Sequence, residues 1–247
     1  MELDYIKHQD CLEGMKSIPD GSVDMVLCDL PYGTTANKWD VQLDMDLLWS
    51  EYKRVCKENA AIVLFSQMPF TVTLVNSNPK MFRYEWIWQK CQGTGHLNVR
   101  RMPLKAHENL LVFYKSRPTY NPQMTEGDPY FKQRDSRSTN YNKLDYLRPT
   151  SIVNTGFRFP TDVITINRKL SDQGLHPTQK PVEVCEYMIN TYTNPGEVVL
   201  DNCMGSGTTA VACMNTGRHY IGFEKDTGYY NAAVNRIKNH TSQLTLS

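Results

Sequence analysis

The chain has 247 residues, of which 40% are hydrophobic and 21% charged, and its formal net charge is +1. These values are typical of a globular domain with a sizeable core and argue against a disordered chain. No apolar run approaches the roughly 18 residues of a membrane-spanning helix, and the polar start MELDYIKHQD does not resemble a signal peptide. We therefore expect a cytoplasmic protein that does not contact a membrane.

Cysteine and histidine usage argues against structural metal and disulfides. The seven cysteines are irregularly spaced and include no C-x-x-C pair, so neither a disulfide framework nor a zinc site is indicated. The run His107-Glu108-Asn109 lacks the second histidine of an H-E-x-x-H metal site. We expect no metal ion in this protein.

Strands and helices alternate along the first 114 residues. The hydrophobic pattern predicts strands at 2–7, 23–28, 60–65, 81–89 and 109–114, and helices at 11–18 and 44–58. The apolar run VDMVLC at 23–28 is typical of a parallel strand that is buried on both faces.

The pattern breaks down from residue 115 to about 170. Five prolines and many Asn, Ser and Thr residues leave little regular structure there. Between Lys115 and Lys169 there are ten Lys and Arg residues against five Asp and Glu, interleaved with seven aromatic residues. This composition fits a surface that neutralises phosphates and contacts bases. A solvated, loop-rich insertion would have the same composition, so both interpretations stay open at this point.

Regular alternation resumes after residue 170, with helices predicted at 181–193, 207–216 and 226–239 and strands at 197–200 and 218–223. Such alternation predicts an α/β fold with a mostly parallel sheet and helices on both faces. We expect one large domain built from two halves, 1–114 and 171–247, that flank an insertion at 115–170.

A glycine-rich turn joins the strand ending at Asp201 to the next predicted helix. It contains Gly205-Ser206-Gly207, where glycines allow a sharp turn and a close approach of a ligand to the helix start. Ala210 replaces the third glycine of a dinucleotide fingerprint, and no lysine follows as in a phosphate-binding loop. Glu224, at the end of the next strand, is placed to accept hydrogen bonds from ribose hydroxyls. These features predict a site for a nucleoside-type cofactor.

The second chemical signal is the turn Asp29-Leu30-Pro31-Tyr32, directly after the strand at 23–28. Ligands of open α/β sheets bind at the carboxyl ends of the strands. There, Asp29 and a backbone carbonyl could accept the two N–H bonds of an exocyclic base amine, and Tyr32 could stack on the base. Alternatively, the aspartate caps the next segment and the tyrosine packs on the core.

Together with His176-Pro-Thr-Gln-Lys-Pro181, these two turns resemble the beta group of DNA amino-methyltransferases, in which the catalytic tetrapeptide precedes the cofactor motifs. The resemblance covers nearly the whole chain. It implies a Rossmann-like, seven-stranded, mostly parallel sheet with an antiparallel edge hairpin in circularly permuted order, S-adenosyl-L-methionine as cofactor and double-stranded DNA as partner. It leaves a homodimer and a cognate restriction nuclease open.

The resemblance also assigns roles to individual residues. The catalytic motif is Asp29, Leu30, Pro31 and Tyr32. The cofactor residues are Asp10, Cys11, Asp29, Thr178, Lys180, Asp201, Cys203, Met204, Gly205, Ser206, Gly207, Thr208, Thr209 and Glu224. The region 115–170 corresponds to target recognition, and the candidates for DNA contact are Arg100, Arg101, Lys105, Lys132, Arg134 and Arg137.

The chain departs from the family pattern at two places. Leu30 stands where adenine enzymes commonly have proline, and Asn202-Cys203 stands where the cofactor loop commonly has Pro-Phe. Because Asp29 comes first in the tetrapeptide, the resemblance favours methylation of the N6 amine of adenine by direct attack on a flipped base. The alternatives are N4 methylation of cytosine, which more often uses serine first, RNA or protein-amide methylation, which uses asparagine first, and an inactive DNA-binding relative.

Overall fold

The computed structural model describes residues 1–33, 42–133, 151–167 and 179–244. The chain divides into two compact units, one made of Met1–Asn121 with Asp162–Ser247, and the other of Pro122–Thr161. Among the described residues, no helix has the length and apolar character that crossing a membrane requires.

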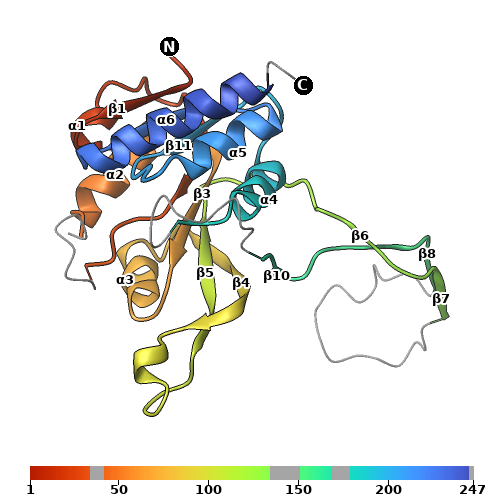
Figure 1. The fold of residues 1–247 in the computed structure, drawn as a ribbon. Coiled ribbons are helices and arrows are strands. Elements are labelled where there is room, and N and C mark those ends of the chain that lie inside the picture. Colours follow the sequence, from red (N-terminus) through yellow and green to blue (C-terminus); the bar gives the residue numbers. More distant parts are fainter. Residues whose placement is uncertain (34–41, 134–150, 168–178, 245–247) are drawn as a thin grey trace. The chain divides into compact units, whose positions relative to one another are not determined.

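The first unit is built on one eight-stranded sheet (Figure 1). In spatial order its strands are β1 (Tyr5–His8), β12 (His219–Glu224), β11 (Val198–Asp201), β2 (Val23–Cys28), β3 (Cys56–Ser66), β5 (Lys105–Phe113), β4 (Phe82–Thr94) and β10 (Val163–Thr165). Only β5 runs antiparallel to its neighbours. The predicted mostly parallel sheet with an antiparallel hairpin is confirmed, and β10 adds an eighth strand beside that hairpin.

Successive residues of the central strands enter opposite cores. In β2, Met25 and Leu27 pack on one face and Val26 and Cys28 on the other. The first face is covered by α4 (Val182–Tyr192) and α5 (Thr208–Thr216), and the second by α1 (Cys11–Met15), α2 (Met45–Val55) and α3 (Phe70–Ser77). The helix α6 (Thr227–Leu244) lies along β1 and β12. Burial on both faces explains the continuous apolar strand runs of the sequence.

Each helix and strand predicted outside 115–170 has a counterpart, but α3 was not predicted. Its sequence FTVTLVNS is rich in β-branched residues, which have low helix propensity. Phe70 and Leu74 nevertheless lie one turn apart and are both buried against the sheet. Tertiary packing of these two side chains therefore decides the conformation of this segment.

The described residues of the second unit form two small antiparallel ladders. In one, β6 (Thr125–Glu126) pairs with β9 (Phe157–Arg158), and in the other β7 (Tyr130–Gln133) pairs with β8 (Ser151–Asn154). The aromatic side chains described in this unit are largely exposed, and the Arg158 guanidinium lies 4.8 Å from the centre of the Tyr130 ring. This unit is contained in the segment 115–170, whose role in target recognition is a proposal discussed below.

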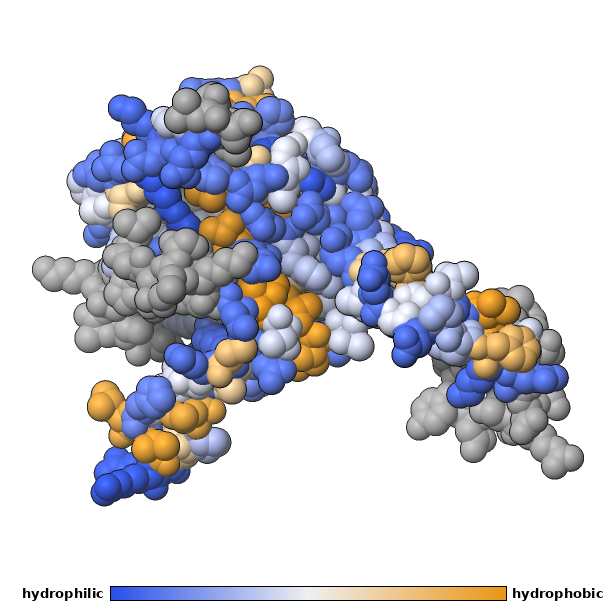
Figure 2. All heavy atoms as spheres, turned by 45° about the vertical axis from the view of Figure 1, so that its right-hand side comes forward, coloured by the Kyte–Doolittle hydropathy of each residue, from blue (hydrophilic) through white to orange (hydrophobic). Residues whose placement is uncertain are grey.

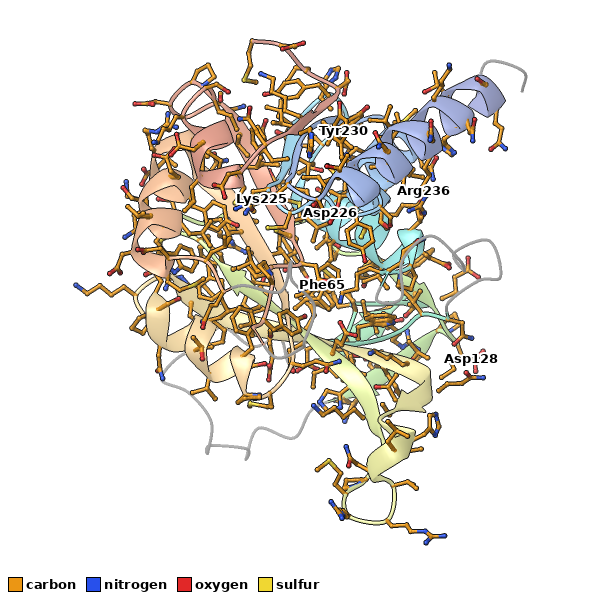
Figure 3. The ribbon with its side chains drawn as sticks, turned by 60° about the vertical axis from the view of Figure 1, so that its left-hand side comes forward. Phe65, Asp128, Lys225, Asp226, Tyr230 and Arg236 are labelled. Atoms are coloured by element: carbon orange, nitrogen blue, oxygen red, sulfur yellow. The ribbon has the colours of Figure 1, made fainter. Side chains whose placement is uncertain are left out.

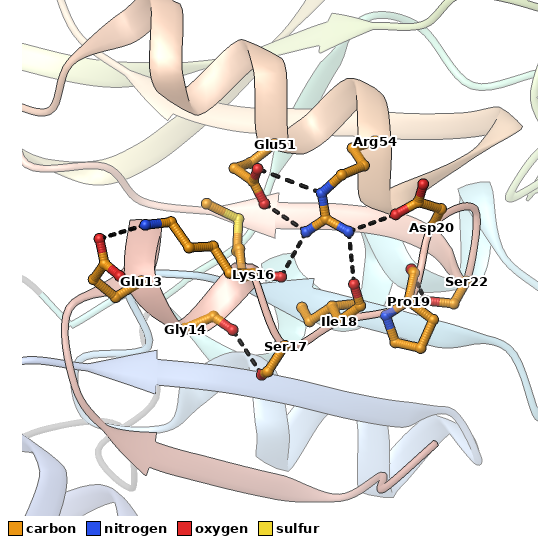
Figure 4. A network of polar contacts seen from close by, with 11 residues as sticks. Glu13, Gly14, Lys16, Ser17, Ile18, Pro19, Asp20, Ser22, Glu51 and Arg54 are labelled. Carbon is orange, nitrogen blue, oxygen red and sulfur yellow. Dashed lines mark hydrogen bonds and ion pairs between the residues drawn. The ribbon is translucent and has the colours of Figure 1, made fainter.

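Arg54, in the last turn of α2, holds the segment between α1 and β2 (Figure 4). Its guanidinium donates hydrogen bonds to the carbonyl oxygens of Met15 and Ile18, both at 2.8 Å, and pairs with Glu51 and Asp20. The planar fork of arginine suits several acceptors at once. These bonds fix α2 against the end of α1.

We expect Arg54→Met to lower the free energy of unfolding by about 1–3 kcal/mol, because two carbonyl groups lose a charged donor. The matched control is Lys16→Met, which removes only an exposed pair with Glu13 and should leave the unfolding free energy close to that of the natural protein. Urea unfolding measures both values. Equal effects of the two variants would contradict the proposed role of Arg54.

Candidate active site

The carboxyl ends of four parallel strands bring the predicted motifs to one edge of the sheet. Leu200 of β11 pairs with Val26 of β2 and with Ile221 of β12, and β12 pairs in turn with β1. Since these strands run parallel, Asp29 follows β2 at the same edge where β11 and β12 end in Asp201 and Glu224. The two sequence motifs, far apart in the chain, therefore lie side by side.

The carboxylate of Asp29 has a partner on each oxygen. Its Oδ1 accepts a hydrogen bond of 2.9 Å from the Tyr32 hydroxyl, and its Oδ2 lies 2.8 Å from Lys180 Nζ. The Tyr32 ring stacks on Phe70 of α3, with 4.7 Å between ring centres and 26° between the planes. Leu30 is buried in the core and Pro31 is half-buried, so within the tetrapeptide only Asp29 and Tyr32 offer polar side chains to this site.

Lys180 is a buried cation between two carboxylates. Besides Asp29, its Nζ lies 2.9 Å from Glu108 Oε2, and Glu108 also pairs with Lys90 of β4. Burial lowers the pKa of Lys180, but attraction by Asp29 and Glu108 outweighs it and leaves the pKa raised. Burial likewise raises the pKa of Glu108, but the two lysines lower it below its ordinary value. The ammonium and the Glu108 carboxylate therefore stay charged near neutral pH.

Asp201 shapes the glycine-rich loop from inside. Its Oδ1 accepts a 3.1 Å hydrogen bond from the Cys203 backbone N–H, and its Oδ2 accepts one of 2.6 Å from the Thr209 hydroxyl. Burial raises the pKa of Asp201 to about 6, although both hydrogen bonds oppose that rise. Asp201 thus ties the first residues of the loop to the first turn of α5.

Asn202, a departure from the family pattern, is also anchored. It is buried, and its Oδ1 accepts a 2.6 Å hydrogen bond from the Tyr52 hydroxyl of α2. The neighbouring Cys203 is half-buried and packs against the core. A polar contact to α2 therefore holds the loop where the family pattern has proline.

The loop and the end of β12 fit a nucleoside cofactor. Gly205 and Gly207 have φ of +55° and +80°, a region that favours glycine, and open space surrounds the position of a Cβ at Gly205. The Glu224 carboxylate accepts the backbone N–H groups of Gly205 at 2.8 Å and Asp226 at 2.7 Å. A carboxylate offers about four lone-pair positions, so Glu224 can still accept ribose hydroxyls. Lys225, Asp226 and Tyr230 lie together near the start of α6 (Figure 3).

Asp10 and Cys11 follow β1 at the same edge of the sheet. Asp10 caps α1 by accepting the Leu12 N–H at 3.0 Å, and it pairs with Lys225 at 3.2 Å. Cys11 is buried and packs in the same core as Cys28 and the half-buried Cys203. Burial raises the pKa of Cys28 to about 12, so its thiol stays protonated near neutral pH and is a poor nucleophile.

The remaining predicted residues fall into three groups. The buried ones, in the glycine-rich loop and the first turn of α5, are Met204, Ser206, Thr208 and Thr209. Arg100, Arg101 and Lys105 are exposed on the β4–β5 hairpin, and Lys132 is exposed in β7 of the second unit. Thr178, Arg134 and Arg137 lie outside the described residues. In the part of the chain that the structure describes, no cluster of His, Cys, Asp and Glu is suited to a metal ion.

The sequence motifs single out neither Glu108 nor Lys90 nor Phe70 as an individual site residue. Glu108 begins the buried part of β5, and its charge directly before the run NLLVF is the signal that could have drawn attention to it. Lys90 and Phe70 carry no comparable local signal. Their contacts with Glu108 and Tyr32 depend on the pairing of β4 with β5 and on the packing of α3.

The raised pKa of Asp201 predicts a pH-dependent contribution to stability. The folded state binds this proton more tightly than the unfolded chain, so the contribution is full below pH 4 and is lost as the pH rises through about 6. We expect Asp201→Asn to remove it, so that the unfolding free energy of the variant relative to the natural protein rises by up to about 3 kcal/mol from pH 4 to 7. Urea unfolding across this range measures the difference, and parallel profiles would contradict it.

Known proteins share both the sequence pattern and the fold. The family model N6_N4_Mtase, described as DNA methylase, matches residues 23–235. Type II methyltransferase M.HindIII of Haemophilus influenzae is 23% identical over 299 aligned positions, which cover 95% of each chain.

Two solved structures have the same fold. The crystal structure of the M1.HpyAVI–SAM complex superposes with a TM-score of 0.62 at 24% identity and covers 94% of this chain and 98% of that one. PvuII DNA methyltransferase, which is cytosine-N4-specific, gives a TM-score of 0.67 at 15% identity, covering 96% and 91%. Because the family model spans most of its length, the chain belongs to the N6_N4_Mtase family of DNA methylases.

Proposed function

We propose that this DNA methyltransferase transfers the methyl group of S-adenosylmethionine to the N6 amine of adenine in duplex DNA. The observation that carries the proposal is the Asp29 carboxylate, held by Tyr32 and Lys180 at the strand edge beside the glycine-rich loop. A carboxylate in that place accepts N–H bonds and leaves a neighbouring position for a methyl donor.

Residues around the loop would hold the cofactor. Glu224 would accept the ribose hydroxyls, Gly205 would allow a close approach, and Asp10 with Cys11 would border the adenine end. The carboxylates of Asp29 and Glu224 also suit a cofactor that carries a positive sulfonium. When bound, S-adenosylmethionine supplies an electrophilic methyl group.

Asp29 would orient the target amine. The lone pair of an exocyclic base amine is delocalised into the ring, so the nitrogen is a poor nucleophile until its N–H bonds are held. One N–H would donate to Asp29 Oδ1, displacing or sharing the position of the Tyr32 hydroxyl, and the other would donate to a carbonyl of the turn. The nitrogen lone pair would then point at the methyl donor. As the new N–C bond forms, the methyl–sulfur bond would break and leave its electron pair on sulfur, and the nitrogen would give up one proton to the Asp29 carboxylate that accepts its N–H bond.

The base must leave the helix to reach this edge. Turning a base out of the duplex costs a few kcal/mol of stacking and pairing, which stacking in the pocket offsets. Tyr32 presents an aromatic ring that is already held by Phe70. We therefore assign Tyr32 to the face of the flipped base.

Lys180 would act on Asp29. Its ammonium fixes Oδ2 and leaves Oδ1 for the substrate, so it is a positioning residue for the catalytic carboxylate. The basic, aromatic second unit and the candidates Arg100, Arg101, Lys105, Lys132, Arg134 and Arg137 would bind the duplex. Methylation of cytosine at N4 is the second candidate, because the cytosine-N4-specific PvuII enzyme has the same fold.

The methylated product shows whether adenine or cytosine is the substrate base. Incubation with S-adenosylmethionine and unmethylated duplex DNA, followed by digestion to nucleosides and mass spectrometry, should give N6-methyladenine. The Asp29→Ala variant should lose transfer while it keeps most of its cofactor affinity in calorimetry. N4-methylcytosine would overturn the choice of base, and wild-type turnover in Asp29→Ala would remove Asp29 from the mechanism.

Replacing Lys180 distinguishes two roles for it, namely positioning Asp29 and binding the cofactor. We expect Lys180→Met to lower kcat by about 100-fold, because Asp29 loses the contact that positions it, and to change cofactor affinity little. The matched control is Lys90→Met, which also removes a partner of Glu108 but does not contact Asp29, and should keep most of kcat. A weaker cofactor affinity with unchanged kcat in Lys180→Met would assign Lys180 to the cofactor instead.

A further inference from the structure

The tip of the β4–β5 hairpin, residues 95–104, exposes apolar side chains. Leu97 is fully exposed, at 101% of its reference area, and Val99 and Met102 are exposed by 56% and 51%. In Figure 1 this hairpin extends beyond the body of its sheet, and in Figure 2 its surface shows orange apolar atoms beside blue hydrophilic ones. Clusters of exposed apolar side chains on a protein surface mark binding sites.

The tip is an ordered turn and not a frayed end. Gly95 has φ +93°, a short 3₁₀ helix follows at His96–Asn98, and the Asn98 carbonyl accepts the N–H groups of Arg101 at 2.8 Å and Met102 at 3.0 Å. Leu104 packs closely on Gly93, because a Cβ added to Gly93 would lie only 2.6 Å from the Leu104 Cβ. The apolar side chains are thus held out from the core by a defined backbone.

The positive charge of the hairpin favours DNA as its partner. From Lys90 to His107 the sequence has four Lys and Arg residues and no acidic residue. Arg100, Arg101 and Lys105 are exposed, and within the described ranges none of the three forms an ion pair. Free cations beside apolar side chains complement DNA, where phosphates border stacked bases.

The hairpin also starts from the active site. Glu108 of β5 is linked through Lys180 to Asp29, and Lys105 precedes Glu108 by three residues of strand. At ~3.3 Å per residue, this places the base of the tip roughly 10 Å beyond Glu108. That length is comparable with the ~8 Å depth of a DNA groove.

We propose that the hairpin tip enters the duplex beside the flipped base, with Leu97 as an apolar wedge and Arg100 and Arg101 on the flanking phosphates. The wedge fills the space that the flipped base leaves and so offsets part of the lost stacking. This inference rests on the proposed function. It applies equally to a flipped adenine or a flipped cytosine.

Leu97→Ala tests the wedge. The site that the natural protein methylates is first mapped by sequencing, and methyl transfer is then measured on two duplexes that contain this site. On the fully paired duplex we expect kcat/KM to fall by about 10- to 100-fold. On a duplex with an abasic position opposite the target, the base is already unpaired, and the loss should shrink to about 3-fold or less. The matched control is Leu47→Ala, because Leu47 is also an exposed leucine but lies on α2. Its kcat/KM should match that of the natural protein on both duplexes.

A second readout does not depend on methyl transfer. With 2-aminopurine at the target position, fluorescence should rise when the natural protein binds and rise less with Leu97→Ala. Arg100→Gln with Arg101→Gln should reduce the slope of log affinity against log salt by about 2.

Unchanged activity of Leu97→Ala, or equal losses on both duplexes, would overturn the wedge while leaving the proposed function intact. A shift in oligomeric state in sedimentation, with duplex preference unchanged, would make the tip a protein interface and also overturn it. No methylation of DNA by the natural protein would refute the proposed function and the wedge together.

Discussion

The buried ammonium of Lys180 joins three segments that are far apart in the sequence. It lies between Asp29 after β2 and Glu108 in β5, and it directly precedes the start of α4. A single buried charge would be very costly, but alternating lysines and carboxylates, with Lys90 at the far end, neutralise one another. Because Lys180 contacts both carboxylates, it fixes the turn that begins at Asp29 relative to β5 and to the start of α4. The geometry of Asp29 depends on this constraint.

The glycine-rich loop is held differently, by hydrogen bonds within the loop and to the strands and helices around it. Asp201 accepts hydrogen bonds from two residues of the loop and the following helix, and Glu224 accepts a backbone N–H of the loop. Asn202, bonded to Tyr52 of α2, anchors the loop to the opposite face of the sheet. The loop is thereby preorganised for a ligand, which reduces the entropy lost on binding.

Apolar side chains are distributed unequally between the sheet and its hairpin. Within the sheet, β4 and β5 together contribute buried residues to both cores, whereas the tip between them, residues 95–104, carries exposed apolar and basic side chains. Burial of apolar side chains in the sheet stabilises the fold. The apolar side chains exposed at the tip can instead be buried against a partner, which favours binding. One continuous hairpin thus links the core, the buried ion network and a surface suited to DNA.

The sequence by itself determined the alternation of strands and helices, the buried parallel strands and the two turns, one beginning at Asp29 and the other containing Gly205. These features depend on local patterns, namely hydrophobic periodicity and residues with special backbone preferences, and both can be read directly from the amino-acid sequence. Only the tertiary structure decided that α3 is helical, that Phe70 supports Tyr32, and that Lys180 contacts Asp29 and Glu108. Those contacts join residues separated by tens of positions, and they form because strand pairing and core packing, which no local pattern specifies, bring them together.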